Sequence, residues 1–247
     1  MSISTTIIKN LKGRRHSLKK LVMNYSITNS SVSAYTRADL HIHSYFSKDS
    51  LLTPGEIVKL SVKRGLNVIA VTDHNTIRGG IRTKKAARNT SLLVIPGIEV
   101  KTNLGDVTLL FVEEDPPSRE FDELLDFARS IGAITILPHP FRGHRMLNHL
   151  ILNVDVIEVM NGRTPKKYNI MARELAKLTK KPQSAGSDAH CSLELGCIQL
   201  IFPIQIDDEE EFRRALLNAT SYITGKESPI LVHVISTLTQ FIRKPLN

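Results

Sequence analysis

The chain has 247 residues, 41% of them hydrophobic and 23% charged, which is the composition of an ordinary globular domain with enough apolar material for a core. No apolar run approaches the ~18 to 20 residues of a membrane helix, so we expect no membrane span. Seven of the 33 basic residues lie in residues 1–38, which contain no acidic residue; the rest is nearly neutral, which argues against a general nucleic-acid-binding surface.

The acid-free start of the chain differs in composition from the remainder. We expect residues 1–36 to form a disordered basic extension; the same composition is also typical of an organellar transit peptide, or of a tether to nucleic acid or anionic lipid. We expect one globular domain over residues 37–225 and an amphipathic C-terminal tail or helix over residues 226–247. The two cysteines, Cys191 and Cys197, indicate no disulfide framework and favour a reduced, cytoplasmic protein.

Short apolar runs and amphipathic helical stretches alternate along the rest of the chain. In chain order we expect a strand at 38–42, a helix at 53–64, a strand at 67–72, a helix at 77–89, strands at 92–96 and 107–112, a helix at 118–131, strands at 133–137 and 154–160, a helix at 166–180, strands at 183–186 and 197–202, and a helix at 208–218. Thr53, Ser118 and Asp208 are the expected N-caps, and Glu56 completes a capping box with Thr53. The solidly apolar strands predict a parallel sheet covered on both faces, as in a barrel or a doubly wound fold.

Histidines and carboxylates gather where these strands end. Asp39, His41 and His43 alternate along the first strand, so the period of two places them on one face, where they can bind one metal ion. An ordinary pair of surface histidines is the alternative for this motif taken alone.

Further strand ends carry the same residue types. Asp73 and His74 end the second strand, Glu99 follows the third, His139 follows the fifth, and Asp188 and His190 follow the seventh. Each pair alone is explained as well by hydrogen-bonded structural residues, but the carboxyl ends of barrel strands meet at one mouth, where sites assemble. Imidazole and carboxylate ligands without thiolates suit Zn, Mn or Fe, and their number exceeds the four that one ion needs. We therefore expect at least two divalent metal ions.

Five ordered motifs between residues 37 and 203 resemble the PHP family (polymerase and histidinol phosphatase): Asp-x-His-x-His, Thr-Asp-His-Asn, Gly-x-Glu, His-Pro and Ser-Asp-Ala-His. The resemblance implies a distorted (β/α)7 TIM-like barrel, an α/β fold, with up to three metal ions at its C-terminal mouth. It also implies their ligands: His41, His43, Glu99 and Asp188 on one ion, Glu99 and His139 on a second, and Asp49, His74 and His190 on a third. Asp39 and Asp73 would then orient the histidines.

The sequence departs from the family at one ligand. Members usually supply a further histidine shortly after the glutamate, and residues 103–110 contain none. Asp106 can replace it if Gly105 lets the chain swing the carboxylate toward the barrel axis. The alternatives are a weakly bound second ion and a solvated turn aspartate, so we expect two or three ions.

These features predict an enzyme, a phosphoesterase that hydrolyses a small phosphomonoester or a nucleotide by metal-activated water. The candidate catalytic residues are Asp188, His190, His139 and Arg142. Arg142 is placed to bind a phosphate as a bidentate donor, or it is a solvent-facing loop arginine; the two histidines could donate a proton if substrate displaced them from metal. The turn Asn161-Gly162-Arg163, after the sixth strand, is a weaker candidate for substrate contact, and ordinary turn chemistry is the alternative. Cys191 is interpreted as a bystander thiol.

Two other functions remain open at this point. The same metal-activated water could attack a non-phosphate ester or an amide, and a non-catalytic metal-binding PHP module would keep the ligands without turnover. Nucleic acid could be a substrate or could bind the basic extension. Four other histidines lack a strand-end context and are interpreted as ordinary residues: His16, His144, His149 and His233.

Overall fold

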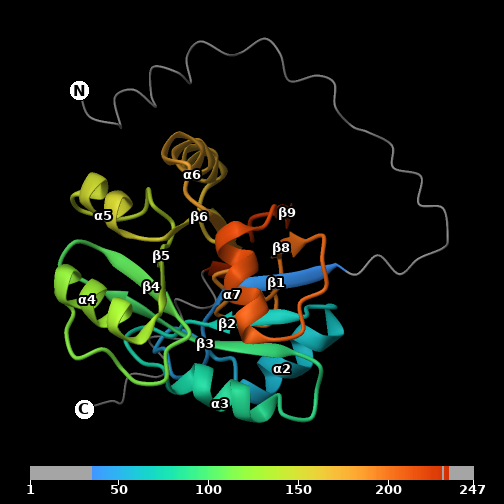
Figure 1. Cartoon of the computed structure of the whole chain (residues 1–247). Coiled ribbons are helices and arrows are strands. Elements are labelled where there is room, and N and C mark those ends of the chain that lie inside the picture. The colour runs from blue at the N-terminus through green and yellow to red at the C-terminus, as the bar shows by residue number, and fades with distance from the viewer. Residues whose placement is uncertain (1–34, 230, 234–247) are drawn as a thin grey trace, which may run out of the picture.

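The structure is a computed structural model that describes residues 35–229 and 231–233, and within them strands and helices alternate along most of the chain (Figure 1). The strands are β1 (Thr36–Ile42), β2 (Val68–Val71), β3 (Leu93–Lys101), β4 (Asp106–Leu110), β5 (Ile134–Leu137), β6 (Val156–Asn161), β7 (Gln183–Gly186), β8 (Ile198–Phe202) and β9 (Tyr222–Gly225). The helices are α2 (Pro54–Lys63), α3 (Arg78–Ala86), α4 (Phe121–Ile131), α5 (Leu147–Asn153), α6 (Lys166–Thr179) and α7 (Glu209–Asn218).

The strands form one sheet that curls into a nearly closed barrel. Their order is β7-β6-β5-β4-β3-β2-β1-β8-β9. The barrel closes where the chain leaving β7 meets the end of β1: Ile42 bridges Ala189, and the His43 amide donates to the Ala189 carbonyl at 2.9 Å. The predicted α/β TIM-like barrel is therefore confirmed.

The expectation of a parallel sheet is wrong at two strands, β4 and β8. β4 runs antiparallel to both β3 and β5, and β8 runs antiparallel to both β1 and β9, so β9 has the same direction as β1. A tight turn joins β3 to β4, in which the Thr102 amide and hydroxyl both donate to the Gly105 carbonyl, at 2.9 and 2.6 Å. So short a connection leaves no room for a crossover helix, and the two strands can only form a hairpin.

Both faces of the barrel wall are apolar, and for this reason the pattern of hydrophobic residues does not distinguish parallel from antiparallel strands. Ile95 and Leu110 face the interior core, whereas Ile98 and Leu109 pack outward against α4, α5 and α6. The helices α2 and α3 cover the wall at β1, β2 and β3. Burying each such side chain contributes roughly 1.5–3 kcal/mol, so both layers stabilise the barrel.

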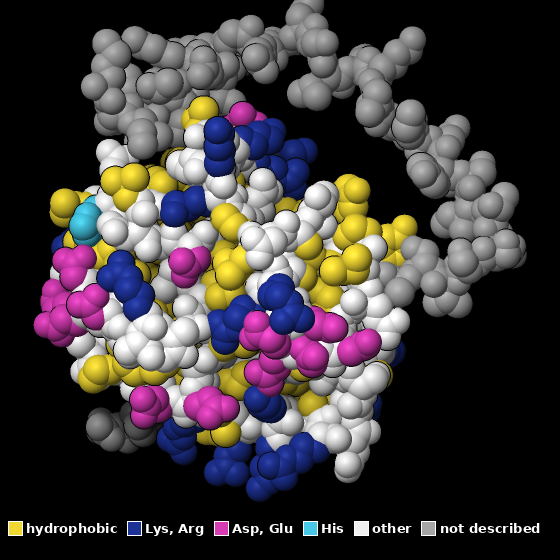
Figure 2. Space-filling view, viewed as in Figure 1, with side chains coloured by type: hydrophobic (Ala, Val, Ile, Leu, Met, Phe, Trp, Pro, Cys, Tyr) yellow, Lys and Arg dark blue, Asp and Glu magenta, His cyan; other side chains and the backbone are white. Residues whose placement is uncertain are grey.

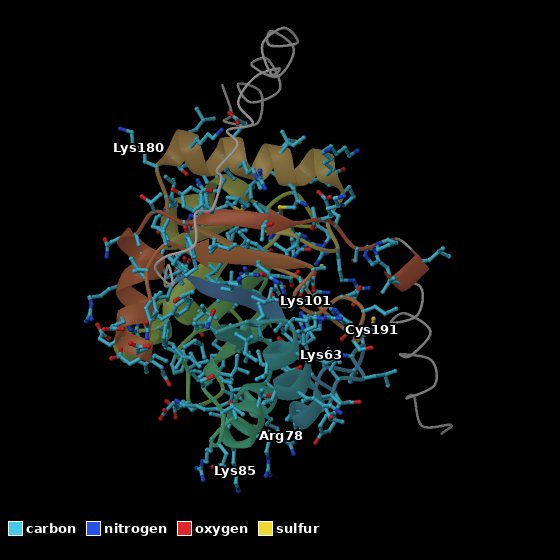
Figure 3. All side chains as sticks on the ribbon, turned by 90° about the vertical axis from the view of Figure 1, so that its right-hand side faces the viewer. Lys63, Arg78, Lys85, Lys101, Lys180 and Cys191 are labelled. Atoms are coloured by element: carbon cyan, nitrogen blue, oxygen red, sulfur yellow. The ribbon has the colours of Figure 1, made fainter. Side chains whose placement is uncertain are left out.

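The strand carboxyl ends gather on one side of the molecule. In Figure 3, Lys101 at the end of β3 and Cys191 after β7 lie toward the right-hand side, whereas Lys180 at the end of α6 lies on the left. Figure 2 shows acidic and basic side chains interspersed over α7, and basic side chains gathered along the lower edge of the view, where α3 lies. No helix of the described residues is long and apolar enough to cross a membrane.

Helix boundaries follow the sequence signals in part. Thr53 caps α2 with the full capping box, and Asp208 caps α7 by accepting from the Glu211 amide at 2.7 Å, as predicted. Ser118 does not cap α4, which begins after Glu120; the Ser118 hydroxyl accepts from the Glu120 amide instead. The short elements α5 and β9 were not predicted.

The expected extensions lie mostly outside the described residues. Of residues 1–36 the structure describes only Tyr35 and Thr36, and β1 begins at Thr36, one residue before the expected start of the domain. Of residues 226–247 it describes 226–229 and 231–233.

Candidate metal centre

Every candidate metal ligand lies at the mouth formed by the strand carboxyl ends. His41 is the last residue but one of β1 and His43 follows that strand, His74 follows β2, His139 follows β5, and Asp188 and His190 follow β7. Glu99 was expected after its strand but lies inside β3, which continues to Lys101 because it pairs with β4. The hairpin thus holds Glu99 on a rigid support.

Four side chains converge at the centre of the mouth, and we call them the central group: His41, His43, Glu99 and Asp188. The Nε2 atoms of His41 and His43 are 3.1 Å apart. Glu99 Oε2 lies 3.6 and 3.5 Å from these two nitrogens, and Asp188 Oδ1 lies 3.7 and 3.3 Å from them. All four side chains are buried. The arrangement is a set of two nitrogen and two oxygen donors around one point.

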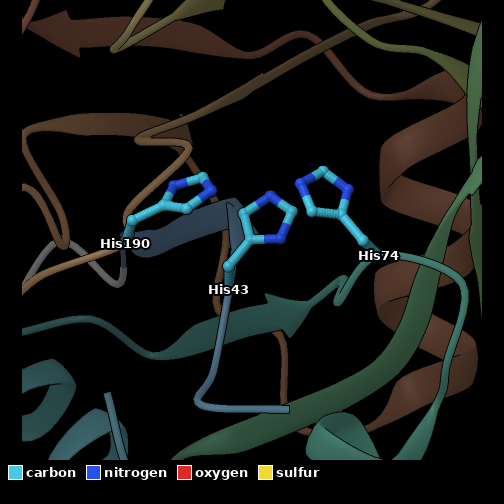
Figure 4. Close-up of side chains that lie close together, drawn as sticks. All are labelled: His43, His74 and His190. Carbon is cyan, nitrogen blue, oxygen red and sulfur yellow. The ribbon is translucent and has the colours of Figure 1, made fainter. Parts of the chain in front are cut away.

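A second set lies nearer to solvent and is called the outer group: Asp49, His74 and His190. Asp49 Oδ2 is 3.3 Å from His74 Nε2 and 3.2 Å from His190 Nε2. Figure 4 shows the His43 ring between the other two imidazoles, with ring centroids 4.3 Å from His190 and 4.4 Å from His74. His43 therefore adjoins both the central and the outer group.

A third set, the oxygen-rich group, consists of Glu99, Asp106 and His139. Glu99 Oε1 lies 3.0 Å from His139 Nε2, and each residue offers a ligand atom within 4.8 Å of those of the others. Gly105 has a φ of +139°, which only glycine adopts without strain, and it is followed directly by Asp106 at the start of β4. Burial and the negative charge of Glu99 raise the pKa of Asp106. Asp106 thus points into the mouth as the hypothesis of a replacement ligand requires.

The three sets fit divalent cations. Burial, together with the neighbouring His190 and His74 side chains, lowers the pKa of His43 to about 3, so this imidazole is neutral and has a free lone pair. Burial would raise the pKa of Glu99, but the charges of His41 and His74 outweigh it and hold that pKa well below its usual range. Asp49 Oδ1 and His139 Nδ1 are buried and make no hydrogen bond within the described residues. A neutral His43 imidazole, an ionised Glu99 carboxylate and unpartnered buried atoms are what a metal-binding site requires. Although burial lowers it, the charges of Glu99 and Asp49 raise the pKa of His74 to about 11, so a cation bound there would replace a proton.

Glu158 is a positioning residue that the sequence reasoning missed. Its side chain is buried in β6, where Oε1 lies 3.0 Å from His41 Nδ1 and Oε2 accepts from the His139 amide at 2.8 Å. One carboxylate thus fixes the His41 ring and the backbone of His139, so it connects two donor groups. The available signal was a glutamate in an otherwise apolar strand.

Asp39 and Asp73, which were expected to orient the histidines, reach them through the backbone and through a serine hydroxyl, not by contact with the rings. Asp39 accepts from the Ser187 amide and hydroxyl and from the Gly196 amide, and it makes only a long 3.4 Å contact with the His41 backbone. Asp73 accepts from Ser47 Oγ at 2.8 Å, and that hydroxyl lies 3.3 Å from His43 Nδ1. Burial raises the pKa of each carboxyl to about 6, although these hydrogen bonds lower it. Both aspartates hold loops in place.

A cavity of about 320 Å³ opens above the central and outer groups. It is lined by Asp49, His74, Arg142, Arg163, Asp188, His190 and His233. Arg142 Nη2 donates to Asp188 Oδ2 at 2.8 Å. Of the four candidate catalytic residues, Asp188, His190 and Arg142 thus face the cavity, whereas His139 is buried and does not line it.

Two histidines interpreted as ordinary residues lie close to the site. His233 lines the cavity, with Nε2 2.7 Å from Ser228 Oγ, and His144 stacks on His139 with ring centroids 5.6 Å apart. His149 instead lies beside Asp122 on α4, and His16 lies outside the described residues. Nothing local in the sequence distinguishes these positions, because tertiary packing brings them there.

Buried Glu194 was also missed. Its Oε2 accepts from the amides of His190 and Cys191, and Arg163 Nε lies 3.5 Å from its Oε1. The carboxylate therefore fixes the loop that carries His190. Burial and the charge of Glu194 raise the pKa of the Cys191 thiol, which keeps it protonated and agrees with its interpretation as a bystander.

Comparison with known proteins gives a consistent result. The PHP domain matches residues 39–154, and a PHP-associated domain matches residues 166–221. An uncharacterized protein of Methanocaldococcus jannaschii is 36% identical over 143 residues, which are 51% of this chain and 82% of that protein. A 5'-3' exoribonuclease of Haemophilus influenzae is 42% identical over 65 residues, or 26% of this chain and 23% of the enzyme.

Solved structures share the fold. A two-domain protein of Bacteroides vulgatus containing a predicted PHP-like metal-dependent phosphoesterase superposes with a TM-score of 0.68 at 19% identity. The match covers 83% of this chain and 70% of that protein. At this identity the likeness concerns the fold alone.

Proposed function

Because the chain belongs to the PHP domain family, we propose that it is a metal-dependent phosphoesterase that hydrolyses a small phosphomonoester or a nucleotide. The observation that carries the proposal is the position of Glu99 between donor groups. Its Oε1 faces His139 Nε2, and its Oε2 faces the central group and His74 Nδ1, which is 3.0 Å away. A carboxylate shared in this way can hold two cations next to each other, as hydrolysis of phosphate esters commonly requires.

Different residues of the chain would bind the cations, bind the phosphate and position the two relative to each other. Cations bound to the three groups would polarise the phosphate and lower the pKa of a water molecule. Arg142 presents its guanidinium at the cavity, where a planar fork matches two phosphate oxygens. Asp188 directs Oδ1 to the central group and accepts from Arg142 at Oδ2, so one carboxylate sets the position of the arginine relative to the cations.

His190 is oriented as a ligand. Its Nδ1 lies 2.8 Å from the Asp188 carbonyl, an acceptor, so Nδ1 carries the proton and the lone pair of Nε2 faces Asp49 Oδ2. This tautomer supports metal binding rather than proton donation. His139, which does not reach the cavity, likewise belongs to the donor set.

Cavity size and charge favour a compact anion. Two arginines line a space of about 320 Å³, which suits a phosphate with a small attached group. The similarity to a 5'-3' exoribonuclease favours oligoribonucleotides as a second substrate class. Hydrolysis of other bonds and a non-catalytic module remain the competing functions.

Metal-stripped and Mn²⁺-loaded protein, assayed in parallel, tests the proposal. The substrates are p-nitrophenyl phosphate, nucleoside monophosphates, 5'-phosphorylated oligoribonucleotides and, as a control for other bonds, p-nitrophenyl acetate. We expect turnover of phosphate esters only, and only after loading. Bound metal without turnover would identify a non-catalytic module, and preferential cleavage of the acetate would identify another hydrolase.

A further inference from the structure

The three donor groups differ in chemical composition. The central group offers two imidazole nitrogens and two carboxylates, and the outer group offers two imidazoles and one carboxylate beside the His43 ring. The oxygen-rich group offers a single imidazole, that of His139, with the carboxylates of Glu99 and Asp106. Affinity for Zn²⁺ over Mn²⁺ or Mg²⁺ depends on nitrogen donors, whereas carboxylate and hydroxyl oxygens suit the harder ions.

A further oxygen lies next to this group. Thr108 is directly opposite Glu99 in the pairing of β3 with β4, and it is 2% exposed. Its Oγ1 is buried and makes no hydrogen bond within the described residues. The period of two puts Thr108 on the same face of β4 as Asp106 and as Leu110, which belongs to the interior core. The unpartnered hydroxyl therefore faces the barrel interior beside Glu99, where a buried polar atom without a partner is unfavourable.

We propose that the oxygen-rich group, with the Thr108 hydroxyl, binds a hard and exchangeable divalent cation, Mn²⁺ or Mg²⁺, while the central and outer groups retain Zn²⁺ or Fe²⁺. This inference rests on the proposed metal-dependent function and adds to it that the sites differ in which cation they bind and in whether that cation exchanges. Asp106 is only half-buried, so a cation at this group can exchange with solvent without disturbing the fully buried central group. Occupancy of the oxygen-rich group by a cation, and hence turnover, then follows the free Mn²⁺ or Mg²⁺ concentration.

Metal binding by the full chain tests the inference without a turnover assay. Stripped protein is loaded with Zn²⁺, desalted, and its metal content measured by mass spectrometry; Mn²⁺ is then titrated and free Mn²⁺ read by electron paramagnetic resonance. We expect the desalted protein to keep its Zn²⁺ and to bind one further equivalent of Mn²⁺. Asp106→Ala should weaken that equivalent by at least about tenfold, as the loss of a ligand does.

Asp106→His adds a nitrogen donor at the same place, so it tests the inference by a gain of metal binding. It should retain one more equivalent of Zn²⁺ after desalting and should lower the Mn²⁺ affinity at the same position. Asp126→Ala, on the exposed face of α4, is the matched control and should change neither value. Circular dichroism verifies that each variant is folded.

Two results overturn the inference: Asp106→Ala binding Mn²⁺ as wild type does, or Asp106→His retaining no additional Zn²⁺. These outcomes are independent of the proposed function. A protein that shows the expected binding but hydrolyses no phosphate ester would reject the phosphoesterase and leave the two classes of cation site in place.

Discussion

Replacing Glu99 by glutamine tests the centre of the site with the smallest change of shape. The side chain is 1% exposed, and its oxygens lie 3.0 Å from both His139 Nε2 and His74 Nδ1. Removing one partner of a buried charged pair costs about 3–5 kcal/mol; because His74 is 39% exposed and thus screened, we expect the lower end. In a domain of this size that loss lowers the Tm of the metal-free protein by about 6–12 °C.

The metal readout is independent of stability. A neutral amide cannot screen two neighbouring cations, so Glu99→Gln should lose at least one equivalent of metal, measured by mass spectrometry, and most phosphatase activity. The pKa of Glu99 is held well below its usual range, so its contribution to stability exists above about pH 4.5 and is lost as the pH falls through the folded pKa. A variant with the full metal complement and a Tm within about 2 °C of wild type would refute the shared-carboxylate assignment. Asp126→Asn, on the surface of α4, is the control.

Three further predictions follow from other contacts. Arg142→Ala should raise KM for phosphate esters with bound metal unchanged, because the arginine lines the cavity and its guanidinium contacts Asp188 Oδ2, while Asp188 Oδ1 faces the central group; unchanged steady-state kinetics would contradict this. Glu158→Gln should weaken metal binding by about 10–100-fold in a chelator competition, since it positions His41 and the His139 backbone. Burial raises the folded pKa of Asp39 to about 6 from 3.8, so metal-free wild type should lose stability relative to Asp39→Asn as the pH rises from about 4 to about 6, by about 3 kcal/mol in urea titrations. A flat difference across that range would contradict the assignment.

The features that the sequence predicts well are local ones. Apolar runs locate most strands to within one or two residues, and the motifs at their ends place His41, His74 and His190 correctly because the carboxyl ends of barrel strands converge whatever the loops do. Capping at Thr53 and Asp208 is confirmed for the same reason, since a cap involves residues three apart. The barrel therefore follows from short-range signals and one general rule of topology.

What the sequence misses depends on residues far apart in the chain. Glu158 lies 117 residues from the His41 ring that it orients, and α6 and β7 separate Glu194 from Arg163, so the sequence near these glutamates does not show either contact. Strand direction failed at β4 because both faces of the wall are buried, and hydrophobicity is then the same for parallel and antiparallel strands.

The hairpin of β3 and β4, where the expected parallel sheet was wrong, also determines the chemistry of the site. Running antiparallel, β4 presents its amino-terminal end to the mouth, so the residues available beside Glu99 are Asp106 and Thr108. A parallel strand over the same residues would have directed Leu110 and Val112 there and left Asp106 at the opposite end of the barrel. The reversal of one strand thus replaces apolar side chains with two oxygen donors at the place where the third set of ligands is needed.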